Sequence, residues 1–109
     1  MPVIQVTAPK ARDGAADDAV RLRSLCAEVA AALGLPPSGV VAVLGDATLT
    51  SSGDEPVTAW PLAVLHGSDR GRDATERALD AAAGALARGW GVPRAEVWVE
   101  WAGYGPARG

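Results

Sequence analysis

The sequence predicts an α+β domain in which two β-α-β units form one four-stranded mixed sheet with two helices on one face. Three observations predict it. Two long segments have apolar residues at helical spacing, short apolar runs flank each of them, and the pattern recurs after 57 residues. A chain of 109 residues with 49% hydrophobic and 21% charged residues fits a single domain with a modest core.

The first unit begins with a strand at Val3–Thr7, followed by a loop through Arg12-Asp13-Gly14. A helix then runs to Leu33, with one apolar face made of Leu22, Leu25, Cys26, Val29 and Leu33. Gly34 suits the left-handed position after a helix, and Pro36 prevents the helix from continuing. The unit closes with a strand at Val40–Leu44.

The second unit repeats this order, with a strand at Trp60–Leu65. Asp73 and Glu76 resemble a capping box, which predicts the start of the second helix there. That helix runs to about Trp90, and its apolar face is Leu79, Ala82, Ala83, Leu86 and Trp90. A last strand at Val97–Trp101 completes the unit.

The two units are related by a constant offset, which indicates an internal duplication. Leu22 and Leu79 are 57 residues apart (79 − 22), and the same offset relates Gly34 to Gly91, Pro36 to Pro93 and Val40 to Val97. We expect one domain over residues 1–109, with repeat one at about 2–45, a linker at about 46–56 and repeat two at about 57–101. The tail from Ala102 to Gly109 is predicted to be a loop or a short edge strand.

Two of the predicted strands indicate self-association. Val40–Leu44 and Leu62–Leu65 are continuous apolar runs, which are typical of strands buried on both faces. Two helices cover only one face of the sheet, so the other face needs a cover that this chain does not contain. Further copies of the chain are the simplest cover, and we expect an oligomer.

Composition excludes several classes of function. A net charge of −3 gives no basic surface for nucleic acid, and no apolar run or signal segment indicates a membrane protein. The single cysteine, Cys26, fits a reducing, cytoplasmic protein and is expected to pack in the core. One cysteine and one histidine make a structural metal site improbable.

Pro2 is the main candidate for chemistry. It follows Met1 directly and leads into the first strand. A small residue after the initiator methionine normally permits its removal, which would leave a secondary amine at Pro2. Such an amine becomes a base or nucleophile when a dry or cationic pocket lowers its pKa.

This layout resembles the tautomerase superfamily over nearly the whole chain, and is closest to the members built like macrophage migration inhibitory factor. The matching landmarks are Pro2, Gly34-Leu35-Pro36-Pro37, Glu55-Pro56, Leu65-His66-Gly67 and Val97-Trp98-Val99-Glu100-Trp101. The resemblance implies a symmetric homotrimer with three pockets at subunit edges, each with an N-terminal proline at its base. It implies no cofactor and no metal.

The chain departs from the migration-inhibitory-factor pattern at three positions. Leu35 stands where that pattern has a lysine, and Trp98 and Glu100 stand where it has a tyrosine and an asparagine. Leu35, Trp98 and Trp101 are expected to form a dry pocket wall. Glu100 is expected to supply a negative charge or a second acid/base group.

Arginines are candidates to replace the missing lysine. Arg12 follows the first strand, where 4-oxalocrotonate tautomerase has a substrate-binding arginine. Arg70 and Arg72 resemble the paired arginines of malonate semialdehyde decarboxylase and cis-3-chloroacrylic acid dehalogenase. Guanidinium groups suit a carboxylate through bidentate hydrogen bonds. The other interpretation is that these arginines are solvated charges, and that His66 is a structural residue at the end of a strand.

Two functions remain open from the sequence. The first is a cytoplasmic tautomerase (isomerase) using Pro2, with Glu100, as general acid/base on a small carboxylate-bearing substrate. Hydratase or decarboxylase (lyase) chemistry is the next option, if Pro2 stays protonated. The alternative is a catalytically silent oligomeric binding or scaffold protein, which retention of Met1 would favour because Pro2 would then be an ordinary amide.

Overall fold

The computed structural model describes residues 1–11, 15–53, 55–56 and 59–103 of the chain. In chain order the elements are β1 (Val3–Ala8), α1 (Ala15–Leu33), the 3₁₀ turn η1 (Pro37–Gly39), β2 (Val41–Asp46), β3 (Ser51–Ser52), β4 (Glu55–Pro56), β5 (Leu62–His66), α2 (Arg72–Trp90), η2 (Arg94–Glu96) and β6 (Trp98–Gly103).

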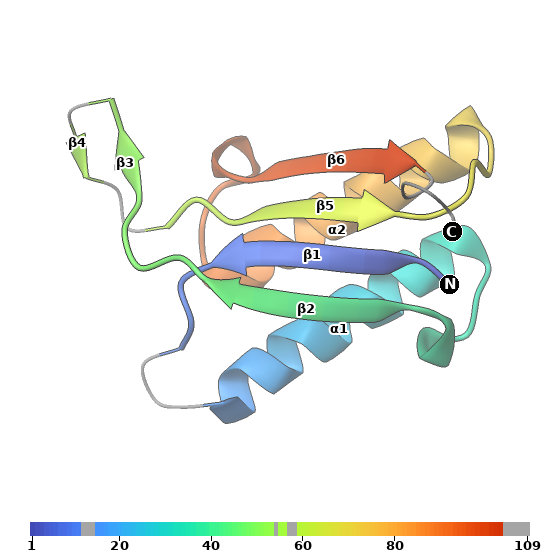
Figure 1. The fold of residues 1–109 in the computed structure, drawn as a ribbon, viewed down its shortest axis with the longest axis horizontal. Coiled ribbons are helices and arrows are strands. Elements are labelled where there is room, and N and C mark those ends of the chain that lie inside the picture. Colours follow the sequence, from blue (N-terminus) through green and yellow to red (C-terminus); the bar gives the residue numbers. More distant parts are fainter. Residues whose placement is uncertain (12–14, 54, 57–58, 104–109) are drawn as a thin grey trace, which may run out of the picture.

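Four strands form one mixed sheet in the order β2-β1-β5-β6, and β3 pairs with β4 in a separate small hairpin. The strand β1 is parallel to β2 and antiparallel to β5, and β5 is parallel to β6. Both helices lie behind the same face of this sheet (Figure 1). The predicted fold class is therefore confirmed.

The core lies between the sheet and the helices. Alternation along β1 sends Ile4 and Val6 into it, while Gln5 and Thr7 lie on the other face of the sheet. Trp101 and Val99 of β6 pack against the core from the same side as Ile4. The remaining face, called the open face below, carries the alternate residues of the four strands: Val3, Gln5, Thr7, Val41, Val43, Leu62, Val64, His66, Trp98 and Glu100.

Element bounds repeat along the chain with the spacing seen in the sequence. Adding 57 to the bounds of α1 (15–33), η1 (37–39) and β2 (41–46) gives those of α2, η2 and β6. Because β1 and β5 are antiparallel, the two halves are related by an approximate two-fold axis perpendicular to the sheet. The division of the chain into repeats at residues 45 and 57 remains a prediction.

Both helices end as predicted, but one begins differently. Gly34 (φ 72°) and Gly91 (φ 66°) have the left-handed conformation that ends a helix. The prediction that Asp73 caps α2 is wrong, because the N-cap is Gly71 and Asp73 lies inside the first turn. In the predicted linker the structure also has the hairpin β3–β4, whose two-residue strands are too short to give a periodic signal.

A polar tie joins the two helices and β1 at the end where α1 begins. The Trp90 indole Nε1 donates a hydrogen bond to the Pro9 carbonyl (2.7 Å), and the Arg21 guanidinium lies 4.6 Å from the centroid of the Trp90 ring. Arg21 Nε also donates to the Gly89 carbonyl (2.8 Å). Within the described ranges no helix is long and apolar enough to cross a bilayer.

Candidate active site at one end of the sheet

Pro2 lies at the end of the sheet where β1 and β2 begin and β5 and β6 finish (Figure 1, right-hand end). Val3 pairs with Val41 of β2 on one side and with His66 of β5 on the other. The Pro2 carbonyl accepts a hydrogen bond from the Val41 N–H (3.1 Å). This end therefore collects the residue before β1, the turn before β2 and the loop after β5.

The Pro2 side chain is buried, on the helix side of the sheet. Its neighbour across the strands is Gly67, whose N–H donates to the Gly103 carbonyl (3.0 Å) at the end of β6. A Cβ atom placed on Gly67 would lie 3.2 Å from Trp101 Cζ2 and 3.7 Å from Pro2 Cβ. The Trp101 ring and the Pro2 ring thus border the same small space.

Leu35 belongs to this end as well. It follows α1, is half-buried, packs against the core, and its N–H donates to the Ala30 carbonyl (2.8 Å). Since the segment that starts here leads into β2, Leu35 approaches the sheet at the end where Pro2 lies. Three of the predicted site residues (Pro2, Leu35 and Trp101) therefore supply apolar surface to one end of the sheet.

Arg70 and Arg72 follow β5 at the same end. Arg70 is half-buried, and its Nε is fully buried without a hydrogen-bond partner among the described residues. Arg72 is the exposed first residue of α2. Within the same described part of the chain, no salt bridge joins either arginine to a carboxylate, and the Asp69 Oδ1 instead accepts from the Gly71 N–H (2.9 Å).

The helix α2 starts beside these arginines with its first N–H groups uncapped by a side chain. The N-terminus of a helix carries a partial positive charge and free N–H donors. Arg70, Arg72 and this helix terminus thus make the loop after β5 attractive to an anion.

Trp98 and Glu100 do not join Pro2 within one chain. Both side chains are exposed on the open face, whereas Pro2 and Trp101 are on the helix side. Trp98 pairs with Leu62, which pairs with Thr7, so it lies five residues, about 16 Å, along the sheet from Pro2. Glu100 pairs with Val64. Arg12 lies outside the described residues.

His66 and Cys26 have ordinary structural surroundings. The His66 Nε2 lies 2.6 Å from Gln5 Oε1 on the open face, as a strand-end structural residue would. Cys26 is half-buried on α1, and burial raises the pKa of its thiol, which lowers its reactivity at neutral pH. Gly67 is the residue that sequence reasoning missed, since it appeared only as part of the Leu65-His66-Gly67 landmark.

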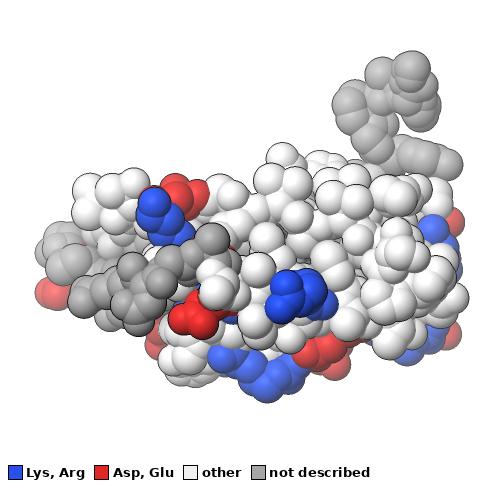
Figure 2. All heavy atoms as spheres, turned by 90° about the horizontal axis from the view of Figure 1, so that it is seen from below, with Lys and Arg blue, Asp and Glu red and all other residues white. Residues whose placement is uncertain are grey.

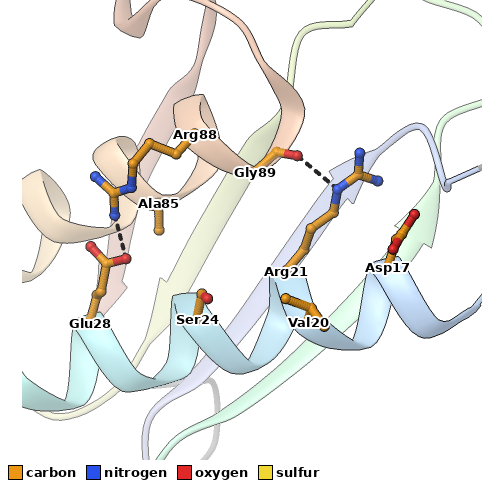
Figure 3. A pocket seen from close by; sticks show the side chains of 8 residues that line it. All are labelled: Asp17, Val20, Arg21, Ser24, Glu28, Ala85, Arg88 and Gly89. Atoms are coloured by element: carbon orange, nitrogen blue, oxygen red, sulfur yellow. Dashed lines mark hydrogen bonds and ion pairs between the residues drawn. The ribbon is translucent and has the colours of Figure 1, made fainter.

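Three of the surface hollows among the described residues are lined by residues other than Pro2, Arg70 and Trp101. The hollow in Figure 3, about 410 Å³, lies between α1 and α2 and is lined by Asp17, Val20, Arg21, Ser24, Glu28, Ala85, Arg88 and Gly89. Three of its charged side chains are in ion pairs, Arg88 with Glu28 and Arg21 with the neighbouring Asp18. The Arg88–Glu28 pair and the hydrogen bond from Arg21 to the Gly89 carbonyl join the two helices, as a structural contact does.

Comparisons with known proteins rest on structure, because neither a protein-family model nor a curated protein matches the sequence. The protein Pt0534 inactivated by 2-oxo-3-pentynoate superposes with a TM-score of 0.84 at 16% identity, covering 98% of this chain and 89% of that one. Macrophage migration inhibitory factor of Toxoplasma gondii gives a TM-score of 0.70 at 21% identity, covering 98% and 93%.

A fused 4-OT described as a symmetric trimer gives a TM-score of 0.72 at 19% identity, with coverage of 98% and 93%. At these identities the chain shares the fold with all three proteins. The tautomerase fold that the sequence resemblance implied is therefore confirmed.

Proposed function

We propose that this chain is a Pro2-dependent tautomerase-like enzyme that acts as general acid/base on a small carboxylate-bearing substrate, a 2-oxo, enol or unsaturated acid. The observation that carries the proposal is that a buried Pro2 and the loop containing Arg70 lie at the same end of the sheet. The buried Nε of Arg70 has no acceptor among the described residues. A buried donor without an acceptor is costly, and turning the Arg70 guanidinium toward a substrate carboxylate at this loop would relieve that cost.

The chemistry follows from the two kinds of group at this end. With its amine free, Pro2 removes a proton from the carbon next to a carbonyl and returns it to another carbon, which is a tautomerisation. Arg70 and Arg72 hold the carboxylate and stabilise the charge that develops on the enolate oxygen. Trp101 and Leu35 exclude water, which favours the neutral amine and lowers its pKa. A Pro2 that stays protonated would instead favour hydration or decarboxylation.

The choice of substrate class is supported by one structural relative. Pt0534, which shares the fold, is inactivated by 2-oxo-3-pentynoate, a short 2-oxo acid. The triple bond of this reagent is conjugated with its ketone. A neutral amine adds to the distal alkyne carbon, an N–C bond forms, and the amine proton passes to the adjacent carbon. The reagent therefore reports both a nucleophilic amine and a carboxylate site.

Labelling with 2-oxo-3-pentynoate tests the proposal. We expect one adduct per chain, on the peptide that begins at Pro2, in protein from which Met1 has been removed. Arg70→Ala or Arg72→Ala should slow labelling by about 10- to 150-fold, the loss of one charge-assisted hydrogen bond of about 1.5–3 kcal/mol. Arg23→Ala, at an exposed position of α1, is the matched control and should label like the parent.

Intact mass and peptide mapping give the answer, with circular dichroism as a check on folding. An adduct confined to Cys26 or Lys10, or no adduct at all, would contradict the proposal and leave the silent binding protein. Equal labelling of all the arginine variants would show that Arg70 and Arg72 are surface charges.

We propose further that the active form is a homotrimer. The open face supports this, since Val41, Val43 and Trp98 are 40%, 53% and 59% exposed there. Among the strand residues named above for this face, Glu100 is the only carboxylate and His66 the only basic residue. Figure 2 shows the same asymmetry, with most charged side chains on the lower, helix side and few on the upper, sheet side. The fused 4-OT with this fold is a symmetric trimer.

The trimer also gives Trp98 and Glu100 a place in the mechanism. Both lie on the face opposite to their own Pro2, so they serve catalysis only if they reach the pocket of a neighbouring subunit. In that arrangement Trp98 is a pocket wall and Glu100 is a second acid/base group.

Sedimentation of matched valine variants tests the assembly. Val43 on the open face and Val20 on α1 are almost equally exposed, at 53% and 52%. We expect Val43→Asp to sediment as a monomer at micromolar concentration, because three carboxylates would be forced into one interface. Val20→Asp should remain a trimer. A parent that sediments as a monomer, or a trimeric Val43→Asp, would contradict the proposed assembly.

A further inference from the structure

Gly67 lies next to Pro2 in the sheet, on the neighbouring strand. Val3 pairs with His66 in the antiparallel ladder. The residue before Val3 is Pro2 and the residue after His66 is Gly67, so these two residues lie opposite each other. Side chains alternate along β5, and Ala63 and Leu65 are buried on the helix side. A side chain at residue 67 would therefore point to the helix side, directly next to the Pro2 ring.

The six-membered ring of Trp101 fills the space that this side chain would take. A Cβ on Gly67 would lie 3.2 Å from the Trp101 atom Cζ2, which is tighter than ordinary van der Waals contact, and 3.5 Å from Cη2. Trp101 pairs with Leu65, two residues before Gly67 on the same face of the sheet, and its ring reaches along the sheet to Gly67. Gly67 does not belong to the glycines with a positive φ, so its backbone conformation does not require a glycine at this position.

From this geometry we infer that Gly67 is a positioning residue, whose missing side chain admits the Trp101 ring to Pro2. Trp101 then supplies the dry wall of the proline, a role that the exposed and distant Trp98 does not fill within its own chain. The inference concerns the site of the proposed function and deepens it. The space at Gly67 that Trp101 and Pro2 both border is the same whether or not Pro2 is catalytic.

Graded substitution tests the contact without any activity assay. In carbon–proton NMR spectra of the protein, the Pro2 ring protons should be displaced from random-coil values by the Trp101 ring current. Trp101→Leu should remove this displacement. Gly67→Ala and Gly67→Val should reduce it stepwise, as the growing side chain pushes the indole away. Gly45→Ala is the control, because a Cβ there meets only the Val6 carbonyl at an ordinary 3.7 Å.

The double variant Gly67→Ala/Trp101→Leu completes the design. If Gly67 acts through Trp101, adding Gly67→Ala to Trp101→Leu should leave the Pro2 resonances unchanged. An equal effect of Gly67→Ala with and without the tryptophan would overturn the inference. So would a Pro2 spectrum that is identical in the parent and in Trp101→Leu.

A second readout connects the contact to catalysis. In processed protein, Gly67→Val should lower kcat/KM by about 10- to 100-fold, as displaced active-site groups do, and should raise the pH at which the Pro2 amine titrates. Loss of the NMR contact without either effect would show that Trp101 touches Pro2 but does not tune it, and would overturn the positioning role. An inactive parent with an intact NMR contact would instead count against the proposed function alone.

Discussion

Retention of Met1 is expected to abolish activity, with kcat/KM lower by about 10²- to 10⁴-fold than in the processed protein. The reason is that an acylated Pro2 has no basic nitrogen, so the group that moves the proton is lost while the fold stays the same. Pro2→Ala keeps a primary amine at the same place and should retain a fraction of the rate. The measurement is turnover of a 2-oxo acid by the three forms across pH.

The pH profile adds a direction to this prediction. An α-amino group titrates at about 8 in model peptides, and we expect the proposed apolar wall to lower the pKa of a free Pro2 amine by disfavouring its charged form. If Pro2 is a base, kcat/KM rises with pH through the pKa of the amine and then becomes constant. A profile that falls through the same range indicates an acid, and therefore hydration or decarboxylation. Equal activity of all three forms would remove Pro2 from the mechanism.

Leu86→Ala is expected to destabilise the protein by about 2–5 kcal/mol, the largest stability loss that we predict. Leu86 is 0% exposed and belongs to the cluster that packs α2 against the sheet, so its truncation leaves a cavity in the core. Leu49→Ala is the matched control, because it removes the same atoms from a leucine that is 91% exposed. Leu49→Ala should change stability by less than about 0.5 kcal/mol.

Urea unfolding at one fixed protein concentration compares the two leucine variants, because association makes apparent stability depend on concentration. A loss of equal size in both variants would show that Leu86 is not the core residue that its burial indicates. A large loss in Leu49→Ala alone would instead place residue 49 in an interface between subunits.

The helices and the main strands were predictable because their patterns are long. Apolar residues at helical spacing over some 19 residues, ended by Gly34 or Gly91, leave few alternatives, and both helices end where that pattern predicts. The start of α2 was not predictable from its capping residues, since Gly71 takes the N-cap without a side-chain hydrogen bond. Local sequence signals compete there with the turn that Asp69 makes with the Gly71 N–H.

The site was predictable in part. The part that could not be predicted depends on the register of the sheet. Resemblance and chain order placed Pro2, Leu35, Arg70 and Arg72 in segments that the structure brings to one end. That Trp101 and Trp98 lie on opposite faces follows from alternation along one strand. That Trp98 lies far from Pro2, and that Gly67 lies opposite it, depends on pairing across three strands, which no local pattern in the sequence specifies.

The approximate two-fold axis of the fold has a consequence for stoichiometry. The residue that corresponds to Pro2 after 57 residues is Ala59, which is also buried before its strand, at 5% exposure. In the proposed trimer, six ends of equivalent backbone geometry would surround the assembly, and only three would begin with proline. A reagent specific for the amine should therefore saturate at three equivalents per trimer. The other three ends, which begin at Ala59, take no part in the proposed reaction. Substitutions can therefore accumulate at these ends of the duplicated chain without loss of activity.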